Sequence, residues 1–413
     1  MFRSLRRMGV AIVIAFVASL ATTAMAAETF KIVYIDPLSG GFANVGRLGV
    51  RHFELFIDMI NNAGGLNGQK VELITYDSQF NTKVATEKVN QGIAAGASII
   101  SQGNGSSVAH AITEAVLKYN TRNPGKEVLF FNYAAVDPAL TNEKCNYWHF
   151  RFDANADIKM KALVKALVQS GKMKKVYIIG QNYSFGQAVA AAAEMELKAQ
   201  APGVKIVGNE LHPVAKVKDF SPYVNKIREA GADTIITGNW GNDMLLLLKA
   251  ASDSGLKAQF ATYYAGGLGS PQAMGASGLG TLVIQEGSLD ETGVVDRNMA
   301  IEYRKKYVAD HEEYSFPRVQ LMFEYLLKAA EQAGSNDPKA IAKALEGMEV
   351  YIRNGRTFMR KEDHQVHQPM YVVEFSKDAR FDAEGTGYGW KTFGSVSAED
   401  TVLPTTCKMD RPG

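Results

Sequence analysis

Cysteine is scarce in this sequence, and neither sign of charge is in clear surplus. The 413 residues contain two cysteines, 45 lysines and arginines, and 43 aspartates and glutamates. So few cysteines exclude a disulfide-dense scaffold. With 46% hydrophobic and 21% charged residues, the composition is that of an ordinary folded chain, which excludes disordered and collagen-like classes. The length predicts two or more domains.

Long hydrophobic runs are missing as well. The apolar run Val10–Leu20 is too short to cross a membrane comfortably. It follows three arginines and precedes Ala24–Ala26, which fits the small-residue pattern of a cleavage site. We therefore predict that residues 1–26 are a signal peptide cut near Ala26 and that the mature protein is periplasmic. An uncleaved anchor is the alternative.

The small basic surplus belongs to that signal. Without its three arginines, 42 basic residues face 43 acidic ones, a formal charge of −1. No basic stripe remains, so we expect no nucleic-acid partner. For an exported chain, the even cysteine count favours one disulfide between Cys145 and Cys407 over two free buried thiols. That bond would tie the C-terminal tail to the body of the protein.

The sequence also lacks the common catalytic motifs. It has no G-x-S-x-G and no P-loop. The stretch GNGSSV at 103–108 begins like a dinucleotide-binding fingerprint, but Val108 stands where the third glycine or alanine should be. Cys145 and His149 could be a nucleophile and its base, yet nothing orients His149. We expect no enzyme and no cofactor.

A metal site could be sought only around Asp363–His367. His364 and His367 are close in sequence, but no further histidine or cysteine cluster accompanies them. A solvent-facing loop or the start of a strand explains this stretch better. We expect no metal.

What the chain does contain is a regular alternation of strands and helices. This pattern predicts parallel sheets in an α/β fold with two doubly wound lobes of about five strands each. The expected strands cover residues 30–35, 71–77, 97–101, 128–133, 175–180, 205–211, 234–238, 259–264 and 282–287, with a late strand at 370–375. The expected helices cover residues 48–62, 81–95, 108–119, 156–170, 186–200, 223–230, 244–254, 296–309, 316–333 and 338–347. Residues 377–413 have no helical period and are expected to form a surface tail.

The stretch ASIISQGNGSSVAH at 97–110 is the first candidate site. It predicts a buried strand, a turn and a helix, with Gly103 and Gly105 free to adopt positive φ and Ser106 or Ser107 as N-cap. The N-terminus of a helix suits a carboxylate or phosphate. An ordinary capped turn is the alternative.

Several segments resemble one known family. They are residues 37–40 (PLSG), 60–79 (INNAGGLNGQKVELITYDSQ), 103–108, 131–141 (FNYAAVDPALT), 182–187 (NYSFGQ) and 353–366 (RNGRTFMRKEDHQV). The chain resembles the solute-binding proteins of ABC importers for branched-chain amino acids (Leu/Ile/Val-binding). The resemblance implies the type I periplasmic-binding fold, in which three crossovers join two lobes and a hinge closes them on a ligand. It also implies a monomer that delivers solute to membrane permease subunits.

The resemblance assigns residues to lobes and to a site. The N-terminal lobe would comprise 28–152 and 285–350, the C-terminal lobe 153–284 and 351–390, and a tail 391–413. The expected ligand-binding residues are Phe42, Ser106, Ser107, Tyr133, Ala134, Ala135, Tyr183, Asn239, Trp240 and Tyr264. Ser106 or Ser107 would donate to a ligand carboxylate.

One departure from the family affects the expected ligand. Amino acid binders of this group place an acidic residue near the strand end that reads Thr262–Ala265 here, and this sequence has tyrosines instead. Asp243 and Glu286 are the nearest acidic candidates for pairing with a ligand ammonium. The aromatic residues would suit an aromatic carboxylic acid, although core packing would also explain them. A small amide as ligand, or a sensor role for the same fold, are further alternatives.

Overall fold

The computed structural model describes residues 28–289, 291, 293–307, 314–352 and 355–412. The predicted signal peptide lies outside these residues. In the part of the chain that is described, no helix is both long and apolar enough to cross a membrane.

The N-terminal lobe is built on a five-stranded parallel sheet in the order β2-β1-β3-β4-β5. Its strands are β1 (Phe30–Asp36), β2 (Val71–Asp77), β3 (Ala97–Gln102), β4 (Leu129–Asn132) and β5 (His149–Arg151). Its helices are α1 (Ala43–Asn62), α2 (Thr82–Ala94), α3 (Ser106–Arg122), α9 (Gly293–Lys306), α10 (Pro317–Ala333) and α11 (Pro338–Leu345). Strand β4 is buried along its whole length, as expected for a parallel strand with both faces covered.

The C-terminal lobe has a seven-stranded sheet in the order β15-β14-β10-β9-β8-β6-β7. The strands are β6 (Lys175–Gln181), β7 (Lys205–His212), β8 (Thr234–Thr237), β9 (Gln259–Thr262), β10 (Leu282–Gln285), β14 (Met370–Ser376) and β15 (Gly389–Val396). Strands β6 to β10 pair in parallel, whereas β14 and β15 are antiparallel additions. The helices are α4 (Ala156–Ser170), α5 (Ser184–Gln200), α6 (Ser221–Glu229), α7 (Gly241–Asp253) and α8 (Ser270–Met274).

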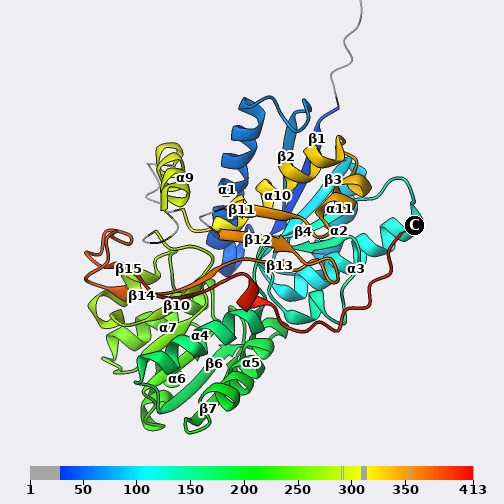
Figure 1. The fold of residues 1–413 in the computed structure, drawn as a ribbon. Coiled ribbons are helices and arrows are strands. Elements are labelled where there is room, and N and C mark those ends of the chain that lie inside the picture. Colours follow the sequence, from blue (N-terminus) through cyan, green and yellow to red (C-terminus); the bar gives the residue numbers. More distant parts are fainter. Residues whose placement is uncertain (1–27, 290, 292, 308–313, 353–354, 413) are drawn as a thin grey trace, which may run out of the picture.

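Three crossovers join the lobes, between β5 and α4, between β10 and α9, and between β13 (Val366–His367) and β14. A three-stranded sheet of β11 (Glu349–Ile352), β12 (Gly355–Met359) and β13 (Val366–His367) precedes the last crossover. It lies between the lobes in Figure 1. The predicted two-lobed α/β fold is therefore confirmed, and α4 occupies the predicted range 156–170.

The structure corrects three local expectations. Strand β15 falls within the predicted surface tail, so the expected tail boundary at residue 391 is wrong. The strand lies half-exposed at the edge of the sheet, and its buried and exposed residues do not alternate clearly. The second sheet has seven strands instead of about five. Helix α3 begins at Ser106 with Gly105 as N-cap, so neither serine is the cap.

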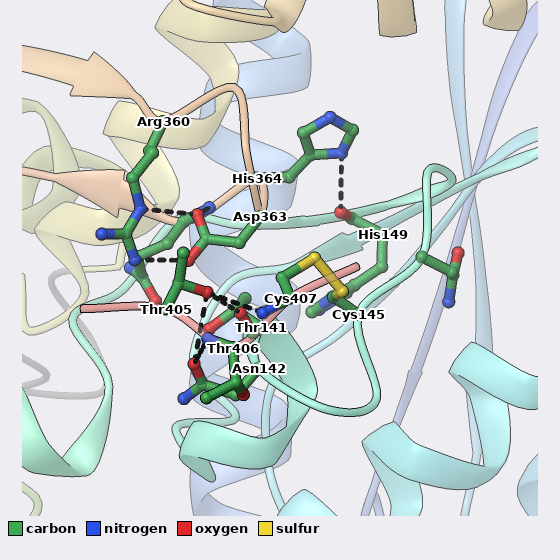
Figure 2. Close-up of a disulfide and its surroundings, with 12 residues drawn as sticks. Thr141, Asn142, Cys145, His149, Arg360, Asp363, His364, Thr405, Thr406 and Cys407 are labelled. Carbon is green, nitrogen blue, oxygen red and sulfur yellow. Dashed lines mark hydrogen bonds and ion pairs between the residues drawn. A yellow bond between two sulfur atoms is a disulfide. The ribbon is translucent and has the colours of Figure 1, made fainter. Parts of the chain in front are cut away.

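The predicted disulfide between Cys145 and Cys407 is present, with Cα atoms 5.7 Å apart. It fastens residues 397–412, the C-terminal strap, to the N-terminal lobe (Figure 2). Thr405 Oγ1 donates to the Thr141 carbonyl at 3.2 Å, and Arg360 Nη1 donates to the Leu403 carbonyl at 2.6 Å. Because β15 belongs to the C-terminal lobe, the strap adds a fourth connection between the lobes.

Candidate functional site

A cleft of about 200 Å³ lies between the lobes and is lined by residues of both. The N-terminal lobe contributes segments 103–106 and 134–136, which follow β3 and β4. The C-terminal lobe contributes residues that follow β6, β8, β9 and β10. The lining thus gathers at the carboxyl ends of parallel strands, where α/β sheets place their ligands.

A buried carboxylate shapes the turn before α3. Asp36 accepts hydrogen bonds from the backbone N–H of Gly103 (3.3 Å) and Asn104 (2.8 Å), and from Asn104 Nδ2 (2.9 Å). The Tyr133 hydroxyl donates to the same carboxylate. Burial raises the pKa of Asp36 to about 6, although these hydrogen bonds favour its charged form. Tyr133 therefore stabilises the turn through its hydrogen bond to Asp36.

Ser106 is the first residue of α3 and is almost fully buried in the cleft wall. Its Oγ accepts a hydrogen bond from the backbone N–H of Asp137 at 3.2 Å, which leaves the hydroxyl proton available to a ligand. The first N–H groups of a helix have no partner within it and attract negative charge. Ser107 is half-buried and does not line the cleft.

Aromatic rings bring the lobes into contact beside the cleft. Phe42 of the N-terminal lobe stacks on Trp240 of the C-terminal lobe with centroids 3.9 Å apart, and Phe80 packs against both Trp240 and Tyr183. Trp240 Nε1 donates to the Tyr183 hydroxyl at 2.8 Å. Gly241 has φ +59°, and a Cβ there would lie 2.6 Å from the Phe42 ring. The lobes are therefore in contact across this edge.

The structure brings part of the predicted site together. The predicted residues that line the cleft are Ser106, Ala134, Ala135, Tyr183, Trp240 and Tyr264, whereas Phe42, Ser107, Tyr133 and Asn239 do not line it. Phe42 and Tyr133 instead contact the lining residues Trp240 and Asn104. Asn239 is buried against His212, with Nδ2 2.9 Å from His212 Nε2.

The two acidic candidates for a ligand ammonium have different positions. Asp243 lies outside the cleft, where it accepts from Gln181 Nε2 (2.8 Å) and from the backbone N–H of Ala215 (2.9 Å). It ties the start of α7 to the end of β6 and to the loop that contains Ala215. Glu286 follows β10 and lines the cleft, where it belongs to a larger cluster.

That cluster, the charged quartet, consists of Asp153, Lys159, Glu286 and Arg318, all of them buried. Lys159 Nζ lies 2.7 Å from Glu286 Oε1 and 2.9 Å from Asp153 Oδ1. Arg318 Nη1 lies 3.4 Å from Glu286 Oε2, and Arg318 Nε lies 4.0 Å from Asp153 Oδ2. The quartet joins the first crossover, α4, the second crossover and α10, so it ties the two lobes together near the hinge.

The quartet sets the charge states of its members. Burial opposes ionisation of Glu286, but Lys159 and Arg318 hold the pKa of that carboxyl well below its usual range. Burial and the neighbouring Glu286 carboxylate raise the pKa of Asp153. Asp153, Lys159 and Arg318 were not predicted from the sequence. The ion pairs that join the two lobes connect distant residues, such as Lys159 and Glu286, which are 127 positions apart, and they leave no local pattern.

His52 of α1 supports the wall formed by residues 314–316. Its Nδ1 donates to the Leu48 carbonyl at 2.8 Å, while Nε2 accepts the backbone N–H groups of Ser315 (3.3 Å) and Phe316 (3.2 Å). An acceptor at Nε2 requires the neutral ring. Burial lowers the pKa of His52 to about 3, in keeping with that role.

Acid should therefore weaken the fold through His52. Because its pKa falls from about 6.5 in the unfolded chain to about 3 in the folded chain, the stabilisation is fully present above pH 6.5 and lost as the pH falls toward 3. Between pH 6 and pH 4, the free energy of unfolding should fall by roughly 2 kcal/mol more than in His52→Gln. Urea unfolding of both proteins across this range measures the difference. Identical pH slopes would contradict the assignment.

The two histidines near residue 365 have hydrogen-bonding partners of their own. His364 and His367 are both buried, so the expected solvent-facing loop is wrong. His367 lies in strand β13, which agrees with the expected strand. His364 Nε2 lies 3.2 Å from Glu346 Oε1, and His367 Nδ1 lies 3.0 Å from Thr401 Oγ1. Among the described residues, no group of three or more potential metal ligands of the His, Cys, Asp and Glu types comes together.

Comparison with known proteins gives consistent matches over nearly the whole chain. Residues 29–380 match the family described as periplasmic binding protein. Leu/Ile/Val-binding protein homolog 4 of Brucella melitensis is 40% identical over 394 residues, covering 94% of each chain.

Solved structures agree. The leucine-, isoleucine-, valine-, threonine- and alanine-binding protein of Brucella ovis, in a closed conformation, has a TM-score of 0.84 at 39% identity, covering 94% of this chain and 100% of that one. A solute binding protein of an ABC transporter from Rhodopseudomonas palustris, in complex with 3,4-dihydroxybenzoic acid, has a TM-score of 0.76 at 18% identity, covering 90% of this chain and 98% of that one. The second likeness is one of fold alone.

Proposed function

Since the chain belongs to the periplasmic binding proteins, we propose that it captures a small carboxylate-bearing solute in the interlobe cleft and delivers it to the membrane permease subunits of an ABC importer. The observation that carries this proposal is the cleft itself. Residues of both lobes line it at the carboxyl ends of parallel strands, and the N-terminus of α3 faces it at Ser106. The protein acts as an exported monomer in the periplasm and performs no chemistry on its ligand.

The Brucella relatives support a solute that is an amino acid of the branched-chain type, since one is named a Leu/Ile/Val-binding protein homolog and the other a leucine-, isoleucine-, valine-, threonine- and alanine-binding protein. A second candidate is an aromatic carboxylic acid. The cleft lining favours it, because Tyr183, Phe185, Trp240, Tyr264 and Phe316 offer flat apolar surface to a planar ring.

Binding works through closure of the lobes. When the lobes meet, they remove the ligand from water, and each polar contact to it then strengthens. The stack of Phe42 on Trp240 buries aromatic surface only when the lobes are in contact, so it favours the closed state. A hinge through the three crossovers allows the lobes to part again and release the solute to the permease.

Replacing Ser106 with alanine should weaken carboxylate binding about tenfold or more, because a hydrogen bond to a charged group is lost. Ser107→Ala is the matched control, since Ser107 is the next residue of the same helix and does not line the cleft. Titration calorimetry with L-leucine and with 4-hydroxybenzoate measures both variants. Equal affinities for the two variants would contradict the assigned role of Ser106.

A further inference from the structure

Arg318 is the member of the charged quartet with hydrogen-bonding capacity to spare. It is buried and lines the cleft. A guanidinium carries five N–H donors, and the hydrogen bond of Arg318 within the described residues is the 3.4 Å contact from Nη1 to Glu286. Its buried Nε has no hydrogen-bond partner there. Buried donors without partners are costly, so such a group calls for an acceptor.

The carboxylates of the quartet do not fill that need. Glu286 is bound more closely by Lys159, at 2.7 Å, than by Arg318, at 3.4 Å. The Asp153 oxygen nearest Arg318 is 4.0 Å away, beyond hydrogen-bonding distance. The Arg318 guanidinium is instead held over the Phe316 ring, 4.3 Å from its centroid, which fixes it at the cleft wall.

The surrounding backbone adds positive potential at the same place. Arg318 is the second residue of α10, so the N-terminus of that 17-residue helix opens at the cleft. The N-termini of α3, α5 and α7 contribute lining residues as well, at Ser106, Tyr183 and Trp240. Each helix N-terminus carries a partial positive charge. Together with Arg318 they make the cleft a site for negative charge.

We propose that Arg318 binds the negatively charged group of the solute, and that the protein selects organic carboxylates without requiring an α-ammonium group. This assignment rests on the proposed function of the cleft and narrows its ligand class. An ammonium brought to Glu286 meets the Lys159 and Arg318 cations already bound there. The ammonium group of an amino acid would therefore gain little binding energy from Glu286. The carboxylate group of the solute, in contrast, would bind the Arg318 guanidinium.

The test compares solutes that differ in one group. L-leucine, 4-methylpentanoate and 4-methylpentanamide share a carbon skeleton, as do 4-hydroxybenzoate and 4-hydroxybenzamide. In calorimetric titration of the unsubstituted protein, 4-methylpentanoate should bind at least as tightly as L-leucine. Each amide should bind about 30-fold more weakly, or worse, than its carboxylate, since a buried charged hydrogen bond is lost.

The variants test the residue. In Arg318→Met, carboxylates should bind about 30-fold more weakly and the preference over amides should disappear, while Arg318→Lys should be intermediate. Arg122→Met, at the exposed far end of α3, removes the same charge as a matched control and should stay within twofold. If Arg318→Met fails to fold, Arg318→Met with Asp153→Asn keeps the cluster balanced in charge and serves in its place.

Affinity within threefold in Arg318→Met, or an amide that binds as tightly as its carboxylate, would overturn the assignment. Solutes that bind both proteins equally would leave the receptor function standing without Arg318. If no solute of any class binds the unsubstituted protein, the assignment and the proposed function both fail.

Discussion

Loss of the disulfide between Cys145 and Cys407 should lower the free energy of unfolding by about 2 to 5 kcal/mol. The bond joins residues 262 positions apart, so it closes a very long loop in the unfolded chain. Closing a long loop removes more freedom from the unfolded ensemble than closing a short one. The effect should therefore lie in the upper part of that range.

The contacts of the C-terminal strap cannot replace the covalent bond. The Thr405 hydroxyl is hydrogen-bonded to the Thr141 carbonyl and to Asn142 Oδ1, both at 3.2 Å, and the Thr406 N–H donates to Asn142 Oδ1 at 3.1 Å. Arg411 pairs with Glu346 at a half-exposed site. Such contacts order the strap while the chain is folded but leave the unfolded chain unrestrained. Without the disulfide, the strap should detach before the lobes unfold.

Urea unfolding of the double variant Cys145→Ser, Cys407→Ser measures this effect. The unsubstituted protein in reducing agent should behave like the variant, and reducing agent should leave the variant itself unchanged. Two free thiols on alkylation of the denatured, unreduced protein would refute the bond. An unchanged unfolding midpoint in the variant would refute its stabilising role.

Replacing Lys159 with methionine should cost about 3 to 5 kcal/mol of stability, because it leaves two buried carboxylates short of a cation. Lys159 Nζ is the closest cation to Glu286 and to Asp153, at 2.7 Å and 2.9 Å. Although burial disfavours its charged form, these carboxylates raise the pKa of Lys159. The methionine fills the space of the side chain but supplies no charge.

A second substitution separates charge balance from packing. Asp153→Asn in the Lys159→Met background leaves Glu286 with Arg318 as an even pair and should recover half or more of the lost stability. Lys226→Met is the matched surface control, since Lys226 pairs with Glu210 at 2.6 Å but is exposed, and it should change stability far less. If Lys159→Met unfolds at the same urea concentration as the unsubstituted protein, the charged quartet does not stabilise the fold.

Regular alternation made the fold predictable from sequence. The buried strand Ala97–Gln102 and the helix after its glycine turn stand out because β-rich runs, turn residues and helical spacing are local signals. The disulfide followed from an even cysteine count in an exported chain. Strand β15 was missed because GWKTFGSV, at an exposed sheet edge, mixes polar residues with aromatic ones and has no period of two.

The site was less predictable because it is assembled across distance. Ser106, Ala134 and Trp240 follow strands directly, so their place at the strand ends could be inferred. Arg318 and Lys159 lie on helices, where the sequence marks them as ordinary charged residues. Their burial depends on how α4 and α10 meet at the crossovers. Tyr133 was predicted to bind the ligand and does lie next to the turn before α3. Its hydroxyl, however, donates to the Asp36 carboxylate that holds this turn.

The most direct test of the central claim is thermal unfolding of residues 27–413 with and without candidate solutes. The panel holds leucine, isoleucine and valine, aromatic carboxylates such as 4-hydroxybenzoate, and small amides such as urea. A solute at 100 times its dissociation constant stabilises by about 2.7 kcal/mol, which shifts the midpoint clearly. We predict such a shift with at least one carboxylate. In Ser106→Ala at the same concentration the stabilisation should fall to about half, because tenfold weaker binding leaves the solute at about 10 times its dissociation constant. No shift with any solute would contradict the account of this cleft as a receptor site.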